Sequence, residues 1–250
     1  MNVEKSYIGE PVIRIRGLKK AFGDNKVLRD FDLNVHEGEN VVVLGKSGSG
    51  KSVLIKCIIG LMPPDEGTIN VLGNEVTEMN HVDLDKLRVK VGFLFQSNAL
   101  YDSMTVRENL EFPLRRHGGK MKQSEVDALV MEALENVGLE ETVELMPEDL
   151  SGGMKKRIAL ARTLILKPKI ILYDEPTTGL DPITGKEIGN LMLDIQKKYK
   201  TSSIIISHDL NCVKLTANRI AMLIDGKCHA SGSFEELINS KDKVVREYFD

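Results

Sequence analysis

The segment 45–52 has residue types and spacing that suit phosphate binding. It matches the pattern GxxxxGK[ST] through Gly45, Lys46, Ser47, Gly48, Ser49, Gly50, Lys51 and Ser52, and Val53 follows. Glycines let backbone N–H groups wrap a phosphate, Lys51 can reach the β and γ phosphates, and Ser52 offers a hydroxyl to Mg²⁺. An apolar run precedes this loop and a helical pattern follows it. That context favours an ATP-phosphate site over a flexible Gly/Ser loop.

Two acidic residues, Asp174 and Glu175, end the apolar run 170–173. Asp174 fits a Mg²⁺ coordination shell, and Glu175 can polarise an attacking water as a general base. Because successive strand residues point to opposite sides, we expect the two carboxylates to have different roles. The alternative is a pair of solvated acids at a strand end.

His208 follows another predicted strand, 203–206. At a strand end its imidazole could hydrogen-bond a γ-phosphate or the attacking water. A histidine taken alone is more often structural, but the two preceding motifs favour a site role.

A second phosphate-ready helix terminus is predicted at Ser151, Gly152 and Gly153. Since the loop at Lys51 already holds its own nucleotide, we expect this second terminus to face the γ-phosphate bound by another copy. The prediction is an ATP-dependent homodimer with two ATP sites at its interface. The alternative is an ordinary capped helix with a glycine turn.

The elements that must position these residues alternate between strand and helix. Strands are predicted at 12–15, 32–35, 40–44, 68–72, 170–173 and 203–206, and helices at 52–60, 154–166 and 185–198. Between 105 and 137 apolar residues recur at helical spacing, with Ser124 as a cap and Gly138 as a stop. We therefore predict an α/β P-loop NTPase core with a mostly parallel sheet covered on both faces, an N-terminal antiparallel β subdomain and an inserted helical subdomain.

Length and composition are those of a globular protein. The 250 residues are 42% hydrophobic and 28% charged, which fits one composite domain, although the length also permits two. A net charge of -3 and a pI near 6.0 argue against a nucleic-acid partner.

The lack of an apolar targeting or membrane-spanning segment and the cysteine pattern predict a cytoplasmic protein. No apolar run approaches the roughly 18 residues that span a bilayer, and residues 1–11 lack the apolar region of a signal peptide. Cys57, Cys212 and Cys228 have no CxxC spacing, so we expect reduced, inert thiols.

Taken together, these motifs resemble the nucleotide-binding subunit of ABC transporters, from about residue 12 to 237. The resemblance implies a Walker A loop at 45–52, a signature at 150–154 and a Walker B strand at 170–174. It also implies that Glu175 is the catalytic glutamate and that His208 is the switch histidine.

Further positions acquire roles only through this resemblance. Gln96 would be the Q-loop glutamine that links Mg²⁺ to the transmembrane partner, and Asp181 would belong to a D-loop across the dimer seam. Phe22, where the family often has Tyr, would stack on adenine. Met154 replaces the more usual Gln, and we expect hydrolysis to persist. The implied organisation is a tail at 1–11, an ATP-binding domain at 12–238 with a helical subdomain at about 97–165, and a tail at 239–250.

Several segments are similar to the ATPase of the bacterial Mla phospholipid-trafficking system. They are FQSNAL at 95–100, FPL at 112–114, LSGGMKKR at 150–157, YDEPTTGLDPI at 173–183 and VVREYF at 244–249, the last equally typical of a generic terminal helix. The similarity implies an MlaE-like permease, a small accessory regulator and a peripheral location on the cytoplasmic face of the inner membrane. ATP would then drive phospholipid between the inner and outer membranes.

Other functions compete with this interpretation. An ABC importer or exporter of another substrate would use the same motor, because specificity lies in the transmembrane partner. A non-transport ABC ATPase would carry a long coiled-coil insertion or two cassettes, which this sequence lacks. A P-loop kinase or GTPase would leave the second phosphate-ready terminus unexplained.

Overall fold

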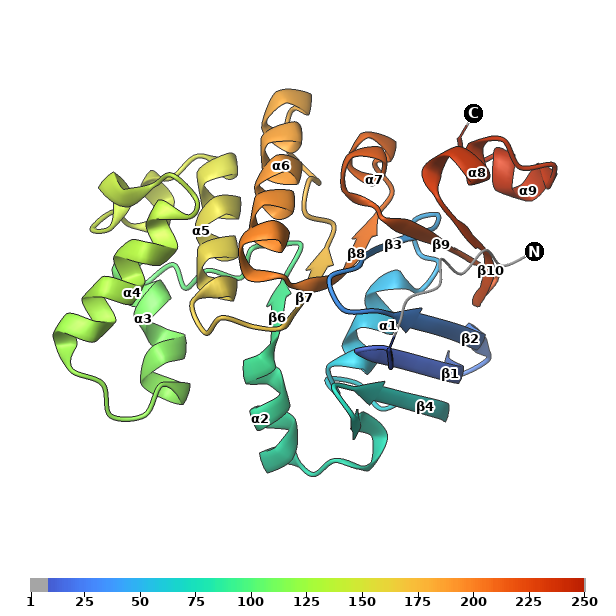
Figure 1. Ribbon diagram of the computed structural model, residues 1–250, viewed down its shortest axis with the longest axis horizontal. Helices are drawn as coiled ribbons and strands as arrows, with labels where there is room; N and C mark the ends of the chain where they lie inside the picture. The colour runs from blue at the N-terminus through green and yellow to red at the C-terminus, as the bar shows by residue number, and fades with distance from the viewer. Residues whose placement is uncertain (1–8, 250) are drawn as a thin grey trace.

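The core of the fold is a mostly parallel sheet, as the sequence predicts. The computed structural model describes residues 9–249 and is shown in Figure 1. Its parallel strands are β3 (Asn40–Leu44), β6 (Val91–Leu94), β7 (Ile170–Asp174), β8 (Ser202–Ser207) and β9 (Arg219–Ile224). Their order is β9-β3-β8-β7-β6, with β3 between β8 and β9.

An antiparallel group of strands extends the other side of the sheet. It contains β1 (Ile13–Phe22), β2 (Asn25–Val35), β4 (Glu66–Val71) and β5 (Asn74–Glu75), which confirms the predicted antiparallel β region. We did not predict β9 or β10 (Lys227–Gly232). β10 pairs antiparallel with β9 and touches β2 in parallel register, so within residues 9–249 the ten strands form one continuous sheet.

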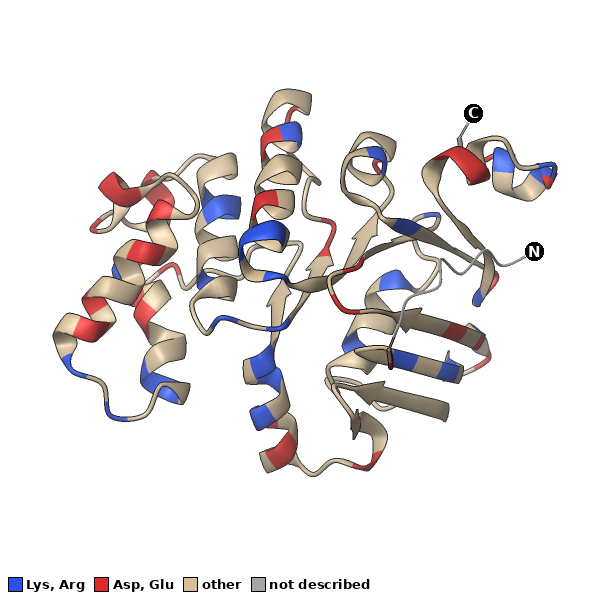
Figure 2. Ribbon diagram, in the orientation of Figure 1, with Lys and Arg blue, Asp and Glu red and all other residues tan. Residues whose placement is uncertain are grey.

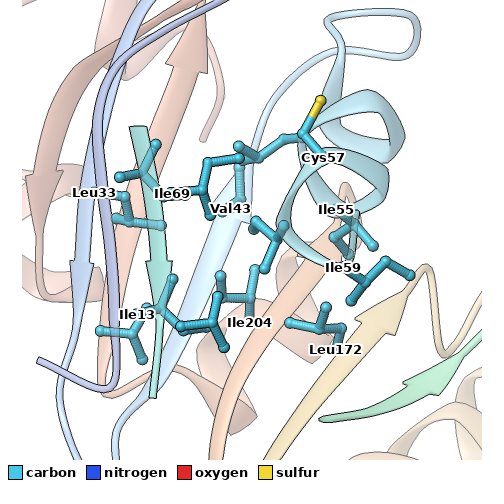
Figure 3. Packing of buried hydrophobic residues seen from close by; sticks show 14 of the residues in the cluster. Ile13, Leu33, Val43, Ile55, Cys57, Ile59, Ile69, Leu172 and Ile204 are labelled. Carbon is cyan, nitrogen blue, oxygen red and sulfur yellow. The ribbon is translucent and has the colours of Figure 1, made fainter. Parts of the chain in front are cut away.

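The two faces of the parallel strands are buried in different cores. Val41 and Val43 of β3 pack into one core and Val42 and Leu44 into the other, because strand side chains alternate. The first core includes α1 (Lys51–Ile58) and α2 (His81–Lys90). Figure 3 shows its packing through Ile13, Leu33, Val43, Ile55, Cys57, Ile59, Ile69, Leu172 and Ile204. The second core includes α6 (Pro182–Tyr199) and α7 (Leu210–Thr216), so both faces are covered.

The chain between β6 and β7 forms a group of helices that stands beside the sheet (Figure 1). It comprises α3 (Val106–His117), α4 (Gln123–Glu135) and α5 (Gly152–Leu164), with short 3-10 turns at Glu140–Thr142 and Pro147–Asp149. These helices share a core of their own that includes Leu110, Val130 and Ile158. The helical insertion that the apolar spacing predicts is therefore present.

The predicted start of α4 needs correction, but its predicted stop does not. Ser124 lies inside the first turn of α4 and is not its cap, because the N-cap is Lys122, whose backbone N–H donates to Glu125 Oε2 at 2.8 Å. Gly138 is the stop, as predicted: it is left-handed with φ 65°, and the N–H groups of Gly138 and Leu139 donate back to Glu135 O and Leu134 O at 3.2 Å each, just after α4 ends at Glu135. Apolar periodicity locates a helix, but local hydrogen bonds decide where it begins and ends.

The segment after β10 packs on the second core. The expected N-terminal tail, 1–11, falls mostly outside the described residues. β10 is followed by α8 (Phe234–Ile238) and α9 (Lys243–Arg246), and Val245 of α9 is buried in the second core. Figure 2 shows charges of both signs spread over the molecule, with acidic residues dense on α4. Among residues 9–249, no helix has both the length and the apolar character to cross a bilayer.

Candidate active site

The phosphate-binding loop connects β3 to α1, and its glycines meet close neighbours. A Cβ on Gly45 would lie 2.6 Å from Ser49 Oγ and 2.8 Å from the backbone oxygen of Leu223. Gly50 has φ 100°, and a Cβ there would lie 2.5 Å from Val27 Cγ1. The loop can therefore keep this path only with glycine at both positions.

Lys51 is the buried cation of this loop. Its side chain is 6% exposed, and Nζ donates to the backbone oxygens of Gly45 at 2.8 Å and Lys46 at 3.0 Å. Nζ also lies 3.9 Å from Glu175 Oε1. Burial lowers the pKa of Lys51, while the carboxylates of Glu175 and then Asp174 oppose that shift.

Ser52 and Asp174 meet although 122 positions separate them in the sequence. Ser52 Oγ donates to Asp174 Oδ1 at 3.1 Å. Burial raises the pKa of Asp174, and the hydrogen bond from Ser52 acts against this. One hydroxyl and one carboxylate are hard oxygen donors of the kind that Mg²⁺ takes alongside nucleotide phosphates, so these residues fit the ion. Residues 9–249 contain no cluster of three or more His, Cys, Asp or Glu that could hold a metal.

Glu175 lies just beyond β7 and has a left-handed backbone, with φ 52°. Its two carboxylate oxygens each lie 2.9 Å from His208 Nδ1, and Thr178 Oγ1 donates to Oε2 at 3.2 Å. Only 8% of the residue is exposed. We expected strand alternation to point the Asp174 and Glu175 side chains to opposite sides, and this reason is wrong. The strand ends at Asp174, and a turn of the backbone at Glu175 redirects that side chain.

Two residues implied by family resemblance lie at the margins of this group. Gln96 is exposed two residues after β6, and its backbone oxygen accepts a hydrogen bond from Lys156 Nζ at 3.0 Å. Phe22 ends β1, is 48% exposed and lies under Lys20 Nζ, 5.7 Å from the ring centroid. An exposed aromatic face next to the β1–β2 turn is accessible to a base.

The second phosphate-ready terminus begins α5. Ser151 is the N-cap, and its Oγ accepts from Met154 N at 3.2 Å. A cavity of about 420 Å³ adjoins it, lined by residues that include Gly152, Gly153, Gly179 and Asp181. Within residues 9–249, no residue of the 45–52 loop lines this cavity. One copy of the chain therefore holds two separate groups of candidate phosphate ligands.

The comparisons with known proteins agree with this geometry. The sequence profile of the family described as ABC transporter matches residues 28–178, more than half of the chain. The chain belongs to this family. It is an ATP-binding, ATP-hydrolysing ABC domain, and it has the fold of that family's nucleotide-binding domains.

Curated relatives of this ABC domain are named as transport or import ATP-binding proteins. The probable ribonucleotide transport ATP-binding protein mkl of Mycobacterium leprae is 39% identical over 95% of this chain and 68% of its own length. The methionine import ATP-binding protein MetN of Clostridium tetani is 39% identical over 90% of this chain and 70% of its own. The chain thus spans about two thirds of the length of these relatives.

Solved structures match the ABC domain over most of its length. A dimeric, post-hydrolysis structure of the ATP-binding cassette MJ0796 with ADP and Pi aligns with TM-score 0.80 and 33% identity, covering 88% of this chain and 98% of that one. The structure of cbiO1 from Clostridium perfringens aligns with TM-score 0.85 and 29% identity, covering 96% and 94%.

Sequence reasoning missed three neighbours of the site. Thr178 hydrogen-bonds Glu175, the backbone of Leu223 restricts Gly45, and Lys156 binds the Gln96 backbone. Thr178 could have been noted as part of the segment after Glu175. Leu223 and Lys156 carry no local signal, since their contacts join distant parts of the chain.

Proposed function

We propose that this chain is the ATP-hydrolysing subunit of a transporter, acting as a homodimer that binds two ATP molecules between its copies. The observation that carries the proposal is that Glu175 lies 3.9 Å from Lys51 Nζ and 2.9 Å from His208 Nδ1, while Ser151 belongs to a second, separate group. The first group suits phosphate binding and water activation. The second has the chemistry to receive the γ-phosphate bound by a partner copy.

Each residue of the first group has a distinct task in this proposal. The loop N–H groups and Lys51 bind the phosphates, and Phe22 stacks on adenine. Ser52, Asp174 and Gln96 would hold Mg²⁺, which neutralises phosphate charge when bound. Glu175 accepts the proton of the attacking water. His208, which already hydrogen-bonds Glu175, orients that carboxylate and can donate to the γ-phosphate.

The homodimer follows from the separation of the two groups. Ser151, Gly152 and Gly153 of one copy would face the ATP held by the other, with Asp181 beside them at the seam. The dimeric ABC cassettes among the similar structures support this arrangement. ATP binding would then close the pair, and loss of phosphate after hydrolysis would open it.

The cargo we propose is phospholipid, moved through a separate MlaE-like permease with the ATPase peripheral on the cytoplasmic face of the inner membrane, together with a small accessory regulator. The support is the set of Mla-like segments, including LSGGMKKR at 150–157. Ribonucleotide or methionine import is the second candidate, because the relatives named above carry those names. The surface near residues 96–105 would transmit motion to any of these permeases.

The motor is tested by Glu175→Gln, which keeps the side-chain volume and removes the base. We expect the variant to bind ATP, lose turnover by at least about 10²-fold, and accumulate as a dimer with Mg²⁺ and ATP. Glu140→Gln, the same change at an exposed glutamate of the helical region, is the control and should behave as wild type. Turnover that persists in a monomeric Glu175→Gln variant would refute the shared-site motor.

The cargo is tested separately by reconstituting this chain with an MlaE-like permease in liposomes. We expect a labelled phospholipid to leave the membrane for an acceptor only when ATP is hydrolysed. Methionine and a ribonucleotide serve as the competing probes. Uptake of either solute without phospholipid movement would replace the lipid proposal and leave the motor intact.

A further inference from the structure

One face of α5 holds the segment that carries Gln96. Two side chains of this helix donate to backbone oxygens of the loop that follows β6. Lys156 Nζ donates to Gln96 O at 3.0 Å, and Arg162 Nη2 donates to Asn98 O at 3.1 Å. Side chains of α5, the helix capped by Ser151, therefore hold the backbone of the loop that contains Gln96 and Asn98.

These hydrogen bonds hold the loop in a backbone conformation that it would not adopt alone. Asn98 and Ala99 are consecutive non-glycine residues with left-handed backbones, at φ 65° and 52°. Such conformations persist when the surroundings hold them. Arg162 also lies over the Tyr101 ring at 5.7 Å, and the buried Asn109 of α3 donates to the Tyr101 backbone oxygen at 3.1 Å.

Lys156 is the exceptional member of this set because it is buried. Figure 2 shows α5 with basic and no acidic residues, and Lys155, Lys156 and Arg157 follow one another. Such a run is ordinarily solvated, yet Lys156 is only 2% exposed, whereas Arg157 pairs with the half-exposed Glu187 at 2.6 Å. Burying an ammonium is costly unless it is paired, so a specific arrangement must offset that cost.

Two groups near Lys156 supply that arrangement. One is the Gln96 backbone oxygen, and the other is the Asp174 carboxylate, whose charge acts on Lys156 against the effect of burial. Gln96 and Asp174 follow the neighbouring strands β6 and β7, which pair in parallel up to Leu94 and Tyr173. The ammonium thus hydrogen-bonds the backbone of Gln96, one of the residues that would hold Mg²⁺, and it stands on the helix whose first turn is the second phosphate-ready terminus.

We infer that Lys156 is a positioning residue for Mg²⁺: its bond to the Gln96 backbone aims the Gln96 side chain at the ion and couples the metal site to α5. The inference rests on the proposed function. Because Lys156 is five positions beyond Ser151 on one helix, a shift of α5 on meeting the partner's γ-phosphate would move Gln96 as well. The metal site would then respond to dimer closure.

The test measures Mn²⁺ binding to the full chain with a non-hydrolysable ATP analogue, from the electron paramagnetic resonance signal of free Mn²⁺. We expect Lys156→Met, which keeps the length of the side chain, to weaken Mn²⁺ binding about tenfold, as loss of an outer-sphere partner does. Binding of the analogue without metal should be unchanged. Lys155→Met is the matched control and should keep wild-type Mn²⁺ affinity, and Lys156→Arg should restore most of it.

A double-mutant cycle shows whether Lys156 acts through Gln96. Gln96→Ala removes the side chain but keeps the carbonyl, so adding Lys156→Met to it should weaken Mn²⁺ binding no further. Additive losses, or wild-type Mn²⁺ affinity in a folded Lys156→Met chain, would overturn the inference. If Lys156→Met fails to fold, Lys156→Gln replaces it with the same expectations. Wild-type chain that hydrolyses no ATP would instead count against the proposed function.

Discussion

At the scale of single residues, Glu175 is where the contacts of the site converge. Its carboxylate accepts a hydrogen bond from Thr178 and lies 2.9 Å from His208 Nδ1 and 3.9 Å from Lys51 Nζ. Its own backbone is left-handed. A non-glycine residue in that conformation costs about 1–3 kcal/mol, which the surrounding contacts must offset. The position of this carboxylate is therefore set by its neighbours and not by its strand.

His208 should matter for turnover and not for ATP affinity. We expect His208→Ala to lower kcat by about 10²-fold, because Glu175 loses the imidazole that orients it. ATP binding, measured by equilibrium dialysis, should stay at the wild-type level. His229→Ala removes another histidine paired with a carboxylate, Asp242 at 2.8 Å, and should leave kcat unchanged. A His208→Ala variant with wild-type kcat would show that Glu175 needs no such partner.

At the scale of elements, α6 begins at a residue that the family resemblance assigns to the dimer seam. Asp181 is the N-cap of α6, and its Oδ1 accepts from Ile183 N at 3.0 Å and Thr184 N at 3.1 Å. The Thr184 hydroxyl and these backbone donors lower the pKa of Asp181. The cap by itself gives a structural reason for an aspartate at this position.

Substitutions at Asp181 test the cap. We expect Asp181→Ala to lower Tm by about 2–4 °C through loss of the cap, whereas Asp181→Asn should nearly retain it. Since folding lowers the Asp181 pKa, its charge stabilises the fold above pH 3.8 and less as the pH falls below that value. The difference in Tm between wild type and Asp181→Ala should therefore shrink in acid. Calorimetry at several pH values measures it, and a constant difference would exclude the charged cap.

At the scale of the whole molecule, the sheet carries the two groups of phosphate ligands without bringing them together in one copy. The 45–52 loop, Glu175 and His208 meet at the ends of β3, β7 and β8, while Ser151 begins a helix beside the sheet. Ile183, at the start of α6 next to the second group, leaves 74% of its surface exposed. A large apolar side chain there suits burial against another copy.

Ile183 should contribute to the dimer interface. In a Glu175→Gln background we expect Ile183→Lys to weaken the ATP-dependent dimer about tenfold or more, since it would bury a lysine without a partner. Val82→Lys is the control, because Val82 is 66% exposed on α2, at the opposite side of the molecule in Figure 1. Analytical ultracentrifugation with and without ATP measures both. Equal dimerisation of the two variants would place the interface elsewhere.

The three cysteines should be inert in the folded chain, as their spacing predicts. Burial raises the pKa of Cys57, Cys212 and Cys228 from 9.0 to about 11 each, so little thiolate forms near neutrality. We expect slow alkylation at pH 8 and complete alkylation in denaturant, read by mass spectrometry. Because folding raises these pKa values, the neutral thiols contribute to the stability of the fold. That contribution is fully present below pH 9.0 and is lost as the pH rises through about 11. Rapid labelling of Cys57 in native protein would contradict the buried core around it.

Much of the site can be predicted because its chemistry is local in the chain. The 45–52 loop, Asp174 with Glu175, and Ser151 with its two glycines are contiguous, and each needs only particular residue types next to a strand or helix end. Alternating apolar strands and helical periodicity also predicted the sheet and the inserted helices. Those features depend on short-range order, which spacing records directly.

The remainder was decided by contacts between distant parts of the chain. Ser52 meets Asp174 across 122 positions, β10 joins the two parts of the sheet, and Lys156 of a charged run is buried and hydrogen-bonds the Gln96 backbone. No local pattern distinguishes a lysine that is buried from one that is solvated, because the difference lies in which strand packs against its helix. The sequence by itself determined which groups could bind phosphate, and the tertiary structure determined which of them meet, since only packing sets long-range neighbours.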